Sequence, residues 1–472
     1  MTSTDAESTH ATGAAIWDGP IQPVNPTTLD DLAALDPTPE SELDEVVDRV
    51  GRAFATWKVD AGARAHLLRS WADALGAESD SLALDLVTET GKPIREAMGE
   101  VAAAVDCLEY NAGLTRQFDG NAGRLSDGTV SHLVREPVGA SVFLVPWNWP
   151  MLLLFRDLSP ALASGVTAVV KPAPQTTHIT NRVVEIGHRA GIPADVVSVV
   201  HGDVAVAQHL LRHRKIRAVA FTGSTRVGEI VLASAARNMV RPLLELGGKN
   251  PAIVFPDADL ESALPELARA AIITSGQMCM ACSRLLVHRS LYADAVSVVR
   301  DVFEKTVLGN PADPDVDMGP LISPAHARTV STAITRARES AEVIGGELVH
   351  PDGLAGHFVQ PTIIANPDPD AAIVHTDVFG PVLTIETFDD DDAAISLANR
   401  TDYGLVAGVW TTDTARALRV ANQVTAGTVW VNGWGKTYPE VPAGGFKSSG
   451  LGRTRGIAGL HQFTELKHIH IS

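Results

Sequence analysis

The alternation of short apolar runs with helical patterns in the middle third of the chain most constrains its fold. Strand-like runs occupy residues 141–145, 167–170, 196–200 and 218–221. The helical spacing of apolar residues covers 151–163, 179–190 and 204–212. Strands that alternate with helices form a parallel sheet, which needs helices on both faces. The sequence therefore predicts an α/β fold.

The rest of the chain adds a second unit and an extension. Helical spacing covers residues 40–114, and further strand-like runs occupy 252–255, 382–386, 405–410 and 428–431. The second set predicts another α/β unit. A polar, Gly-rich stretch over 119–127 precedes an alternating run at 130–134, which predicts a hairpin arm. The last segment, 466–471, also alternates and predicts a terminal strand paired in an oligomer.

Composition and net charge limit the classes of molecule that this chain can bind. The chain has 472 residues, of which 45% are hydrophobic, and a formal net charge of −18. This charge argues against nucleic acid and anionic membranes as partners, so any phosphate-bearing ligand needs a local device such as a helix N-terminus or a single Lys. No apolar run approaches the roughly 20 residues that span a bilayer. Residues 1–15 are polar and acidic, which predicts a disordered leader rather than a signal peptide.

Three cysteines, Cys107, Cys279 and Cys282, indicate a reducing cytoplasm without a disulfide framework. Cys279 and Cys282 form a C-x-x-C pair, so a redox dithiol or half a zinc site is open, but no second pair or His cluster supports a metal, and we predict none. Cys279 also follows a Gly-Gln corner, where access and nearby backbone N–H groups would lower a thiol pKa and create a nucleophile. The alternative is a small buried core residue.

Two motifs are suited to binding a phosphate-bearing ligand. The sequence F-T-G-S-T-R-V-G at 221–228 lies at a strand-to-helix turn, where Gly223 permits close backbone approach and the helix offers free N–H groups. An ordinary helix cap is an equal alternative. Lys171, in K-P-A-P, ends a strand and would face the crevice in which parallel sheets bind ligands. A surface lysine is the alternative.

Two further motifs are suited to acid–base and oxyanion chemistry. In P-W-N-W-P at 146–150, flanking prolines fix the turn, so the amide of Asn148 can serve as a rigid oxyanion donor or can satisfy the turn backbone. In L-E-L-G-G-K-N-P at 244–251, Glu245 lies between two leucines. An apolar setting raises a carboxyl pKa toward that of a general base. Pairing of Glu245 with Lys249 is the alternative.

These motifs, together with G-Q-M-C, D-V-F-G-P-V and P-A-G-G-F-K-S-S-G, resemble those of the NAD(P)-dependent aldehyde dehydrogenase superfamily over nearly the whole chain, from Asn25-Pro26 to the terminal strand. The resemblance implies a Rossmann-like parallel-sheet cofactor domain, a second α/β catalytic domain and a small β oligomerisation arm. It places the cofactor domain at 1–118 and 138–247, the catalytic domain at 248–448, and the oligomerisation elements at 119–137 and 455–472.

The resemblance also implies roles for individual residues. Cys279 would attack the aldehyde, Asn148 with the Cys279 N–H would hold the oxyanion, and Glu245 would activate the water that hydrolyses the thioester. Cys282 would be a bystander. Cofactor contacts would come from Val145, Pro146, Trp147, Lys171, Pro174, Gly223, Ser224, Val227, Leu246, Gly247, Asp377 and Phe379. Of these, Lys171 would contact the adenosine ribose, Gly223 and Ser224 the pyrophosphate, and Phe379 the nicotinamide. The substrate pocket would include Trp149, Arg156, Met278 and Ala443.

Several positions depart from the family pattern. Pro174 replaces a frequent Glu that binds the ribose hydroxyls, so NADP is less excluded than usual and the cofactor is NAD or NADP. Asp377 is one methylene shorter than the usual Glu. Arg156 stands where many relatives have Trp. It would bind a polar or carboxylate-bearing aldehyde, or alternatively pair with Asp157. Ala443 replaces an aromatic wall, which suggests a pocket of altered shape.

The predicted function is oxidation of an aldehyde to the carboxylic acid with NAD(P)⁺ by a cytoplasmic homodimer or homotetramer. One alternative is a CoA-acylating semialdehyde dehydrogenase, which does not need a deacylating base and is therefore disfavoured by Glu245. The other is a non-catalytic homologue. The joint presence of Cys279, Asn148, Glu245 and Lys171 argues against it.

Overall fold

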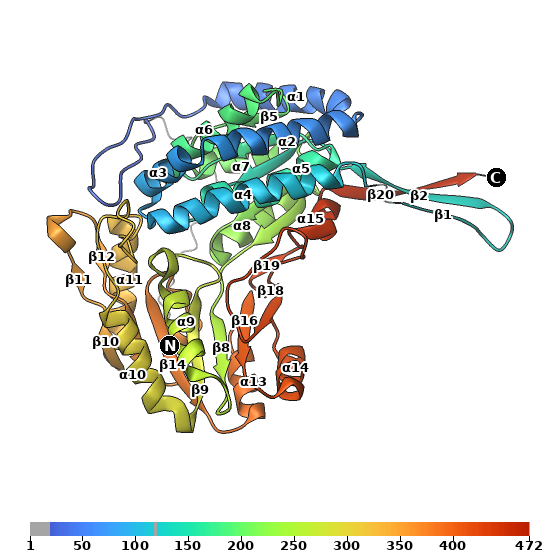
Figure 1. Cartoon of the computed structure of the whole chain (residues 1–472). Helices are drawn as coiled ribbons and strands as arrows, with labels where there is room; N and C mark the ends of the chain where they lie inside the picture. The colour runs from blue at the N-terminus through green and yellow to red at the C-terminus, as the bar shows by residue number, and fades with distance from the viewer. Residues whose placement is uncertain (1–18, 118–119, 472) are drawn as a thin grey trace, which may run out of the picture.

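A computed structural model describes residues 19–117 and 120–471 of the chain. It shows two α/β units, one above the other in Figure 1, and a narrow arm that projects to one side. The leader predicted for residues 1–15 lies outside the described residues, as do residue 119 of the predicted arm and residue 472 of the terminal segment. The fold predicted from the alternation of strands and helices is confirmed.

The first unit is built on a six-stranded sheet with the order β19-β7-β6-β3-β4-β5. Its strands are β3 (Ser141–Leu144), β4 (Ala168–Lys171), β5 (Val197–Val199), β6 (Ala218–Thr222), β7 (Arg241–Glu245) and β19 (Gly450–Leu451). All pairs are parallel except β19 with β7. The chain starts at β3, moves outward to β5 and returns to β6 on the other side of β3. Ligands of such sheets bind where the order reverses, beyond the carboxyl ends of the strands.

Helices cover both faces of this sheet because successive strand residues point to opposite sides. Phe143 packs with α2 (Ala61–Ala77), α4 (Ile94–Leu114), α5 (Pro150–Ser164) and α6 (Thr177–Arg189). Its neighbours Val142 and Leu144 pack instead with α1 (Glu40–Trp57), α7 (Val204–Arg212) and α8 (Thr225–Ala236). Helix α3 (Ser79–Thr90) joins the first face.

The second unit has a seven-stranded sheet with the order β10-β13-β14-β9-β8-β16-β17, parallel except for β10. Its strands are β8 (Asn250–Val254), β9 (Cys282–His288), β10 (Glu342–Gly345), β13 (Thr362–Ala365), β14 (Val382–Phe388), β16 (Val406–Trp410) and β17 (Thr428–Val431). Helices α9 (Leu260–Ile272) and α10 (Tyr292–Glu304) cover one face, and α13 (Asp391–Asn399) with α14 (Thr414–Gln423) the other.

Shorter elements complete the second unit. Helix α11 (Pro324–Ala337) packs beside α12 (Ala372–His375) in a small apolar cluster. Two short antiparallel pairs join β11 (Leu348–Val349) to β12 (Phe358–Val359) and β15 (Tyr403–Gly404) to β18 (Phe446–Lys447). Helix α15 (Gly456–Gln462) returns the chain to the first unit, where it contacts α5. No helix among residues 19–117 and 120–471 is both long and apolar enough to cross a membrane.

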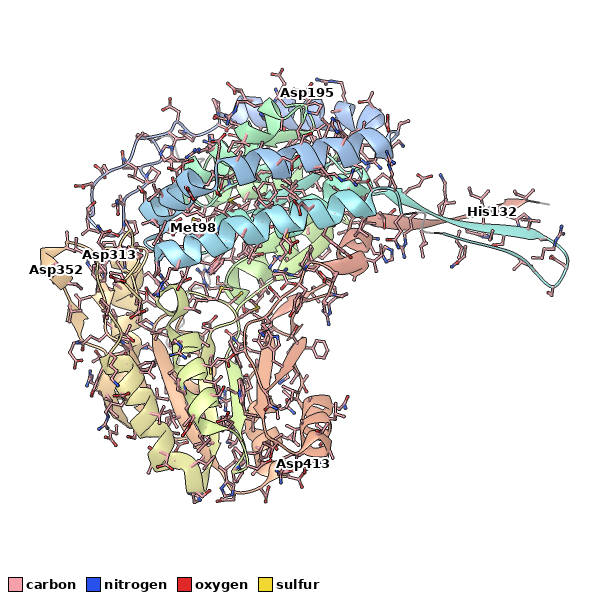
Figure 2. All side chains as sticks on the ribbon, in the orientation of Figure 1. Met98, His132, Asp195, Asp313, Asp352 and Asp413 are labelled. Atoms are coloured by element: carbon pink, nitrogen blue, oxygen red, sulfur yellow. The ribbon has the colours of Figure 1, made fainter. Side chains whose placement is uncertain are left out.

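The arm is a three-stranded antiparallel sheet of β1 (Gly120–Arg124), β2 (Val130–Pro137) and β20 (Thr464–Ile471). The predicted hairpin is present. The terminal strand pairs with β2 of its own chain, from Val130 opposite Ile471 to Pro137 opposite Thr464, and it lies at the edge of the sheet, so its pairing in an oligomer stays a prediction. Figure 2 places His132 on this projecting arm. The arm exposes apolar side chains, among them Leu466 (59%), Ile469 (42%) and Ile471 (51%).

Candidate active site

The predicted site residues of the first unit gather at one edge of its sheet. Asn148 follows β3, Lys171 ends β4, Gly223 follows β6 and Glu245 ends β7. These are carboxyl ends of neighbouring parallel strands, so the loops beyond them surround one crevice. The second unit contributes residues 274–281, which run from the 3₁₀ turn after α9 to the start of β9. We call this segment the nucleophile loop.

An unusual backbone shapes the nucleophile loop. Thr274 and Ser275 have φ angles of 49° and 56°, and Gly276 has 71°. Left-handed conformations are costly for a β-branched residue such as Thr, so the surroundings must hold it. At Gly276 a Cβ would overlap the backbone carbonyl of Gly380, so only glycine fits. The loop therefore has one closely determined path toward Cys279.

Side chains from two distant segments fix the far end of the nucleophile loop. Asn250 at the start of β8 donates from Nδ2 to the carbonyl oxygens of Cys279 and Ala281, each at 2.8 Å. The indole Nε1 of Trp434 donates to the carbonyl of Met280 at 3.0 Å. These bonds fix the carbonyls of Cys279, Met280 and Ala281, and with them the backbone on both sides of the Cys279 thiol.

Asn148 lies directly against the nucleophile loop. Its side chain is buried (4% exposed), and Nδ2 donates to the carbonyl of Gln277 at 3.0 Å. Gln277 is itself held, because its Oε1 accepts from the backbone N–H of Ile322 at 2.9 Å. An amide nitrogen carries two hydrogens, so a second N–H of Asn148 remains for an oxyanion.

Glu245 has the properties of a general base. It is 6% exposed, and within the described structure its Oε1 is buried without a hydrogen-bond partner. Burial raises its pKa to about 7, with Arg156 opposing and Asp157 adding to the shift. The alternative pairing with Lys249 does not account for it. Burial lowers the pKa of Lys249 to about 8, and the charge that most opposes this shift is Asp377, not Glu245.

The thiol of Cys279 differs from the sequence-based expectation. Burial raises its pKa to about 11, and the charges of Glu245 and Asp377 add to the rise, while Arg156 and the backbone N–H of Met280 oppose it. The expected lowering of this pKa is therefore wrong for this conformation, because desolvation outweighs the local N–H donor. A thiol with this pKa is neutral near pH 7, so Cys279 would need a base to act as the predicted nucleophile.

Cys282 has a different environment from Cys279. It is completely buried (0% exposed) in the core of the second unit, and its Sγ contacts the carbonyl of Arg284 at 3.7 Å. Burial raises its pKa. A thiol packed among apolar side chains is inert. This placement matches the expectation that Cys282 is a bystander.

The crevice offers donors that suit a dinucleotide. Ser224 is the N-cap residue of α8, and in the described chain its side chain makes no capping bond, so the first-turn N–H groups remain free for a pyrophosphate. Lys171 is 8% exposed and donates from Nζ only to the carbonyl of Pro172, at 3.2 Å, among the described residues. Burial lowers its pKa to about 8. These residues fit the phosphate and hydroxyl groups of NAD or NADP.

An aromatic cluster lies at the other end of the crevice. Trp147 meets Phe379 edge to face, with ring centroids 5.5 Å apart, and meets His326 at 5.8 Å. Phe379 has a φ of 55°, and its carbonyl contacts His326 Nε2 at 2.7 Å. Asp377 contacts the Phe379 N–H at 3.2 Å, and burial raises the pKa of Asp377 to about 6. The structure thus groups Trp147, Asp377 and Phe379, as expected for nicotinamide contacts.

The remaining cofactor candidates surround the same crevice. Val145 and Pro146 lead from β3 to Trp147, Pro174 begins a 3₁₀ turn after β4, and Val227 lies in the first turn of α8. Leu246 and Gly247 connect β7 to β8. A Cβ on Gly247 would approach Asp377 Oδ2 to 2.6 Å, so the two segments touch here. Direct contacts of these residues with a cofactor stay a prediction.

Arg156 is occupied by partners of its own chain. Its guanidinium donates to both carboxylate oxygens of Asp157, at 2.9 and 2.7 Å, and to Thr222 Oγ1 at 2.7 Å. Arg156 and Asp157 are 6% and 5% exposed. The ion pair given as the alternative is thus present. Thr222 ends β6, so the pair ties α5 to the crevice edge. Among the other pocket candidates, Trp149 is buried, and Met278 and Ala443 are half-buried.

Replacement of Arg156 by alanine is expected to lower the free energy of unfolding by about 3–5 kcal/mol, because Asp157 would remain buried without its partner. Activity should fall by the same factor on succinic semialdehyde and on hexanal, which differ in the carboxylate. Denaturant unfolding and kcat/KM on both substrates measure this. A loss confined to the semialdehyde would instead assign Arg156 to substrate recognition.

Sequence reasoning missed three residues that shape the site. Asn250 lies in a motif already singled out, so its position next to Lys249 was an available signal. No sequence signal pointed to Trp434 or Glu96, because they contact the nucleophile loop from segments more than 150 residues away in sequence. Glu96 accepts hydrogen bonds from Thr274 at the start of the loop.

The chain is similar to characterised proteins over nearly its full length. The family model described as the aldehyde dehydrogenase family matches residues 17–469. Betaine aldehyde dehydrogenase of Vibrio vulnificus is 35% identical over 95% of this chain and 93% of its own. An aldehyde dehydrogenase of Aspergillus niger is 35% identical over 95% and 91%.

The structure is equally similar to a solved one. The crystal structure of betaine aldehyde dehydrogenase from Staphylococcus aureus in complex with NAD⁺ superimposes with a TM-score of 0.93 at 34% identity and covers 95% of this chain and 91% of that one. Fold, site and sequence agree, and the chain belongs to the aldehyde dehydrogenase family.

Proposed function

We propose that this enzyme oxidises an aldehyde to the carboxylic acid with NAD⁺, with Cys279 as nucleophile, Asn148 as oxyanion donor and Glu245 as base. The observation that best supports this assignment is the buried Oε1 of Glu245, which has no hydrogen-bond partner in the described structure. A buried carboxylate oxygen without a partner is costly, and sites of catalysis retain such groups.

Acylation begins at the thiol. The thiol proton passes to a base as the sulfur of Cys279 bonds to the carbonyl carbon, and the carbonyl π electrons become an alkoxide. Glu245 is a suitable base because its charge acts on Cys279 and its pKa is about 7. The free N–H of Asn148 and the backbone N–H of Cys279 stabilise the alkoxide. Oxidised NAD or NADP, when bound, supplies the hydride acceptor.

Deacylation uses the same carboxylate. Glu245 first releases the thiol proton to solvent. Once the carbon on Cys279 is at the acyl level, the ionised Glu245 takes a proton from water, and the oxygen of this water bonds to the acyl carbon. The carbon–sulfur bond then breaks, and the acid leaves with the thiol restored. Because one base serves water activation, hydrolysis does not need CoA as an acceptor.

The cofactor assignment rests on the relatives and on the crevice. NAD⁺ is bound in the Staphylococcus aureus structure, and Lys171, Ser224 and the first turn of α8 offer suitable donors here. Pro174 removes the carboxylate that would repel a 2′-phosphate, so NADP is a second candidate.

We also propose the domain limits given above and a homodimer or homotetramer in which the exposed apolar side chains of the arm are covered.

A panel of aliphatic, aromatic and acidic aldehydes, run with NAD⁺ and with NADP⁺, is expected to give reduced cofactor and the free acid. Addition of CoA should not change the product. Absorbance of the reduced nicotinamide and chromatography of the acid measure this, with Cys279→Ser as the blank. Acyl-CoA as the product would contradict hydrolysis. Bound cofactor without turnover on any aldehyde would favour a non-catalytic homologue.

A further inference from the structure

We propose that Glu96 and Thr274 are positioning residues for the proposed oxidation, which hold the nucleophile loop and the Asn148 turn in register, so that both halves of the oxyanion site face one point. The inference rests on the proposed function of Cys279 and Asn148. It adds residues of α4, a helix that contributes no group to the chemistry itself.

The first contact joins α4 to the start of the nucleophile loop. Glu96 Oε1 accepts from the backbone N–H of Thr274 at 3.1 Å, and Glu96 Oε2 accepts from the Thr274 hydroxyl at 2.5 Å. One carboxylate therefore fixes both the backbone and the side chain of a residue whose φ of 49° is unfavourable for threonine. Strain of this kind persists only where the surroundings impose it.

The second contact joins the same hydroxyl to the Asn148 turn. Thr274 Oγ1 accepts from the indole Nε1 of Trp149 at 3.0 Å while it donates to Glu96. Trp149 directly follows Asn148 in the chain, so this bond holds the turn that carries the Asn148 amide. A single hydroxyl, 2% exposed as part of Thr274, thus connects the segment that carries the nucleophile with the segment that carries the oxyanion donor.

The Asn148 turn is anchored to α4 a second time. The ammonium of Lys92 lies 4.3 Å from the centroid of the Trp149 ring and forms a buried ion pair with Glu100. Glu100 in turn accepts from the backbone N–H groups of Met151 and Leu152, at 2.8 and 3.1 Å. These are first-turn N–H groups of α5, which begins directly after Trp149.

The two anchored segments meet at the amide of Asn148, which donates to Gln277 two residues before Cys279. The Asn148 N–H and the Cys279 N–H must converge on one oxygen within a few tenths of an ångström to stabilise an alkoxide. Misplacement by about 1 Å can lower a rate on the order of 100-fold. Loss of the Thr274 hydroxyl removes the bond that links the two segments, so it should affect the chemical step more than binding.

Three variants of Thr274 separate positioning from stability. Thr274→Val keeps the strained β-branched shape but lacks the hydroxyl, Thr274→Gly also lacks it but relieves the strain, and Thr274→Ser keeps the hydroxyl. We expect kcat to fall about 10- to 100-fold in both Val and Gly, to stay within about threefold in Ser, and the aldehyde KM to change little in all three. The melting temperature should be lower for Val than for Gly.

Glu96→Gln tests the other end of the contact, since one of its two acceptor oxygens becomes a donor. Its kcat should fall by a factor similar to that of Thr274→Val, and the double variant should lose little more than either single variant, because both remove the same link. The matched control is Glu109→Gln on the exposed face of α4, which should retain wild-type kcat. Steady-state kinetics and single-turnover acylation measure these effects.

The proposal would be overturned if kcat and melting temperature fell together, so that Thr274→Gly had a higher kcat than Thr274→Val. The contact would then be purely structural. Additive losses in the double variant, or wild-type kcat in Thr274→Gly, would also overturn it. These outcomes all presuppose an active wild-type enzyme. If wild type itself does not turn over, the proposed function fails, and alkylation of Cys279 by iodoacetamide then compares loop geometry among the same variants.

Discussion

Cys279→Ala is expected to abolish aldehyde oxidation, with kcat lower by at least about 10⁴-fold. Removal of the nucleophile from a cooperative site typically costs this much or more, and only binding and oxyanion contacts remain. The loop itself should keep its path, because Asn250 and Trp434 bond to backbone carbonyls that alanine retains. Reduced-cofactor formation measures activity, and thermal unfolding confirms that the variant is folded.

Cys282→Ala is the matched control. Its thiol lies in the core of the second unit, away from the crevice, so the variant should keep kcat within a few-fold. Removal of one buried sulfur should cost on the order of 1 kcal/mol of stability. Activity that survives in Cys279→Ala but is lost in Cys282→Ala would reverse the assignment of nucleophile and bystander.

Glu245→Gln should slow both halves of the reaction, because Gln can take a proton neither from the Cys279 thiol nor from water. At alkaline pH, where the thiol ionises more readily without a base, the acyl enzyme should still form and should then accumulate, and mass spectrometry should detect Cys279 carrying an acyl group. For wild type, the deacylation rate should fall as pH drops through about 7, because the base must be ionised and its pKa is about 7. A rate independent of pH between 5.5 and 8 would assign water activation to another group.

The same substitution should change stability in a pH-dependent way. Burial raises the Glu245 pKa from 4.5 to about 7, so the folded protein favours the protonated form. The free energy of unfolding contributed by this group is full below pH 4.5 and is lost as pH rises to about 7. Glu245→Gln has no charge to bury, so it should be more stable than wild type at pH 8, by up to about 3 kcal/mol, but not at pH 4.5.

Much of the fold follows from sequence because its signals are local. The runs at 141–145 and 218–221 became β3 and β6, since an apolar run between helical patterns has few other ways to bury itself. The strand that pairs with the terminal strand could not be predicted in this way. Alternation identifies a strand but not its neighbour, and β20 pairs with β2 over more than 300 residues of intervening chain.

The site divides in the same way. Glu245 and Asn148 could be identified because their motifs place them at strand ends, and the apolar neighbours of Glu245 indicated its raised pKa. The raised pKa of Cys279 could not be predicted, because desolvation depends on packing from both units. The left-handed backbone of Thr274 could not be predicted either, since threonine is among the residues least expected in that conformation. Glu96 accepts hydrogen bonds from both the backbone N–H and the hydroxyl of Thr274, and no local pattern connects the two residues.

Backbone contact between Gly276 and Gly380 has a mechanical consequence. A single methyl at position 276 would overlap the Gly380 carbonyl, so nothing compressible separates the two chains. Gly380 directly follows Phe379, which lies against Trp147 at the predicted nicotinamide end. The Phe379 segment therefore cannot move toward the nucleophile loop without displacing the peptide three residues before Cys279. If Phe379 contacts the nicotinamide as predicted, the position of this ring and the position of the sulfur are constrained by the same backbone contact.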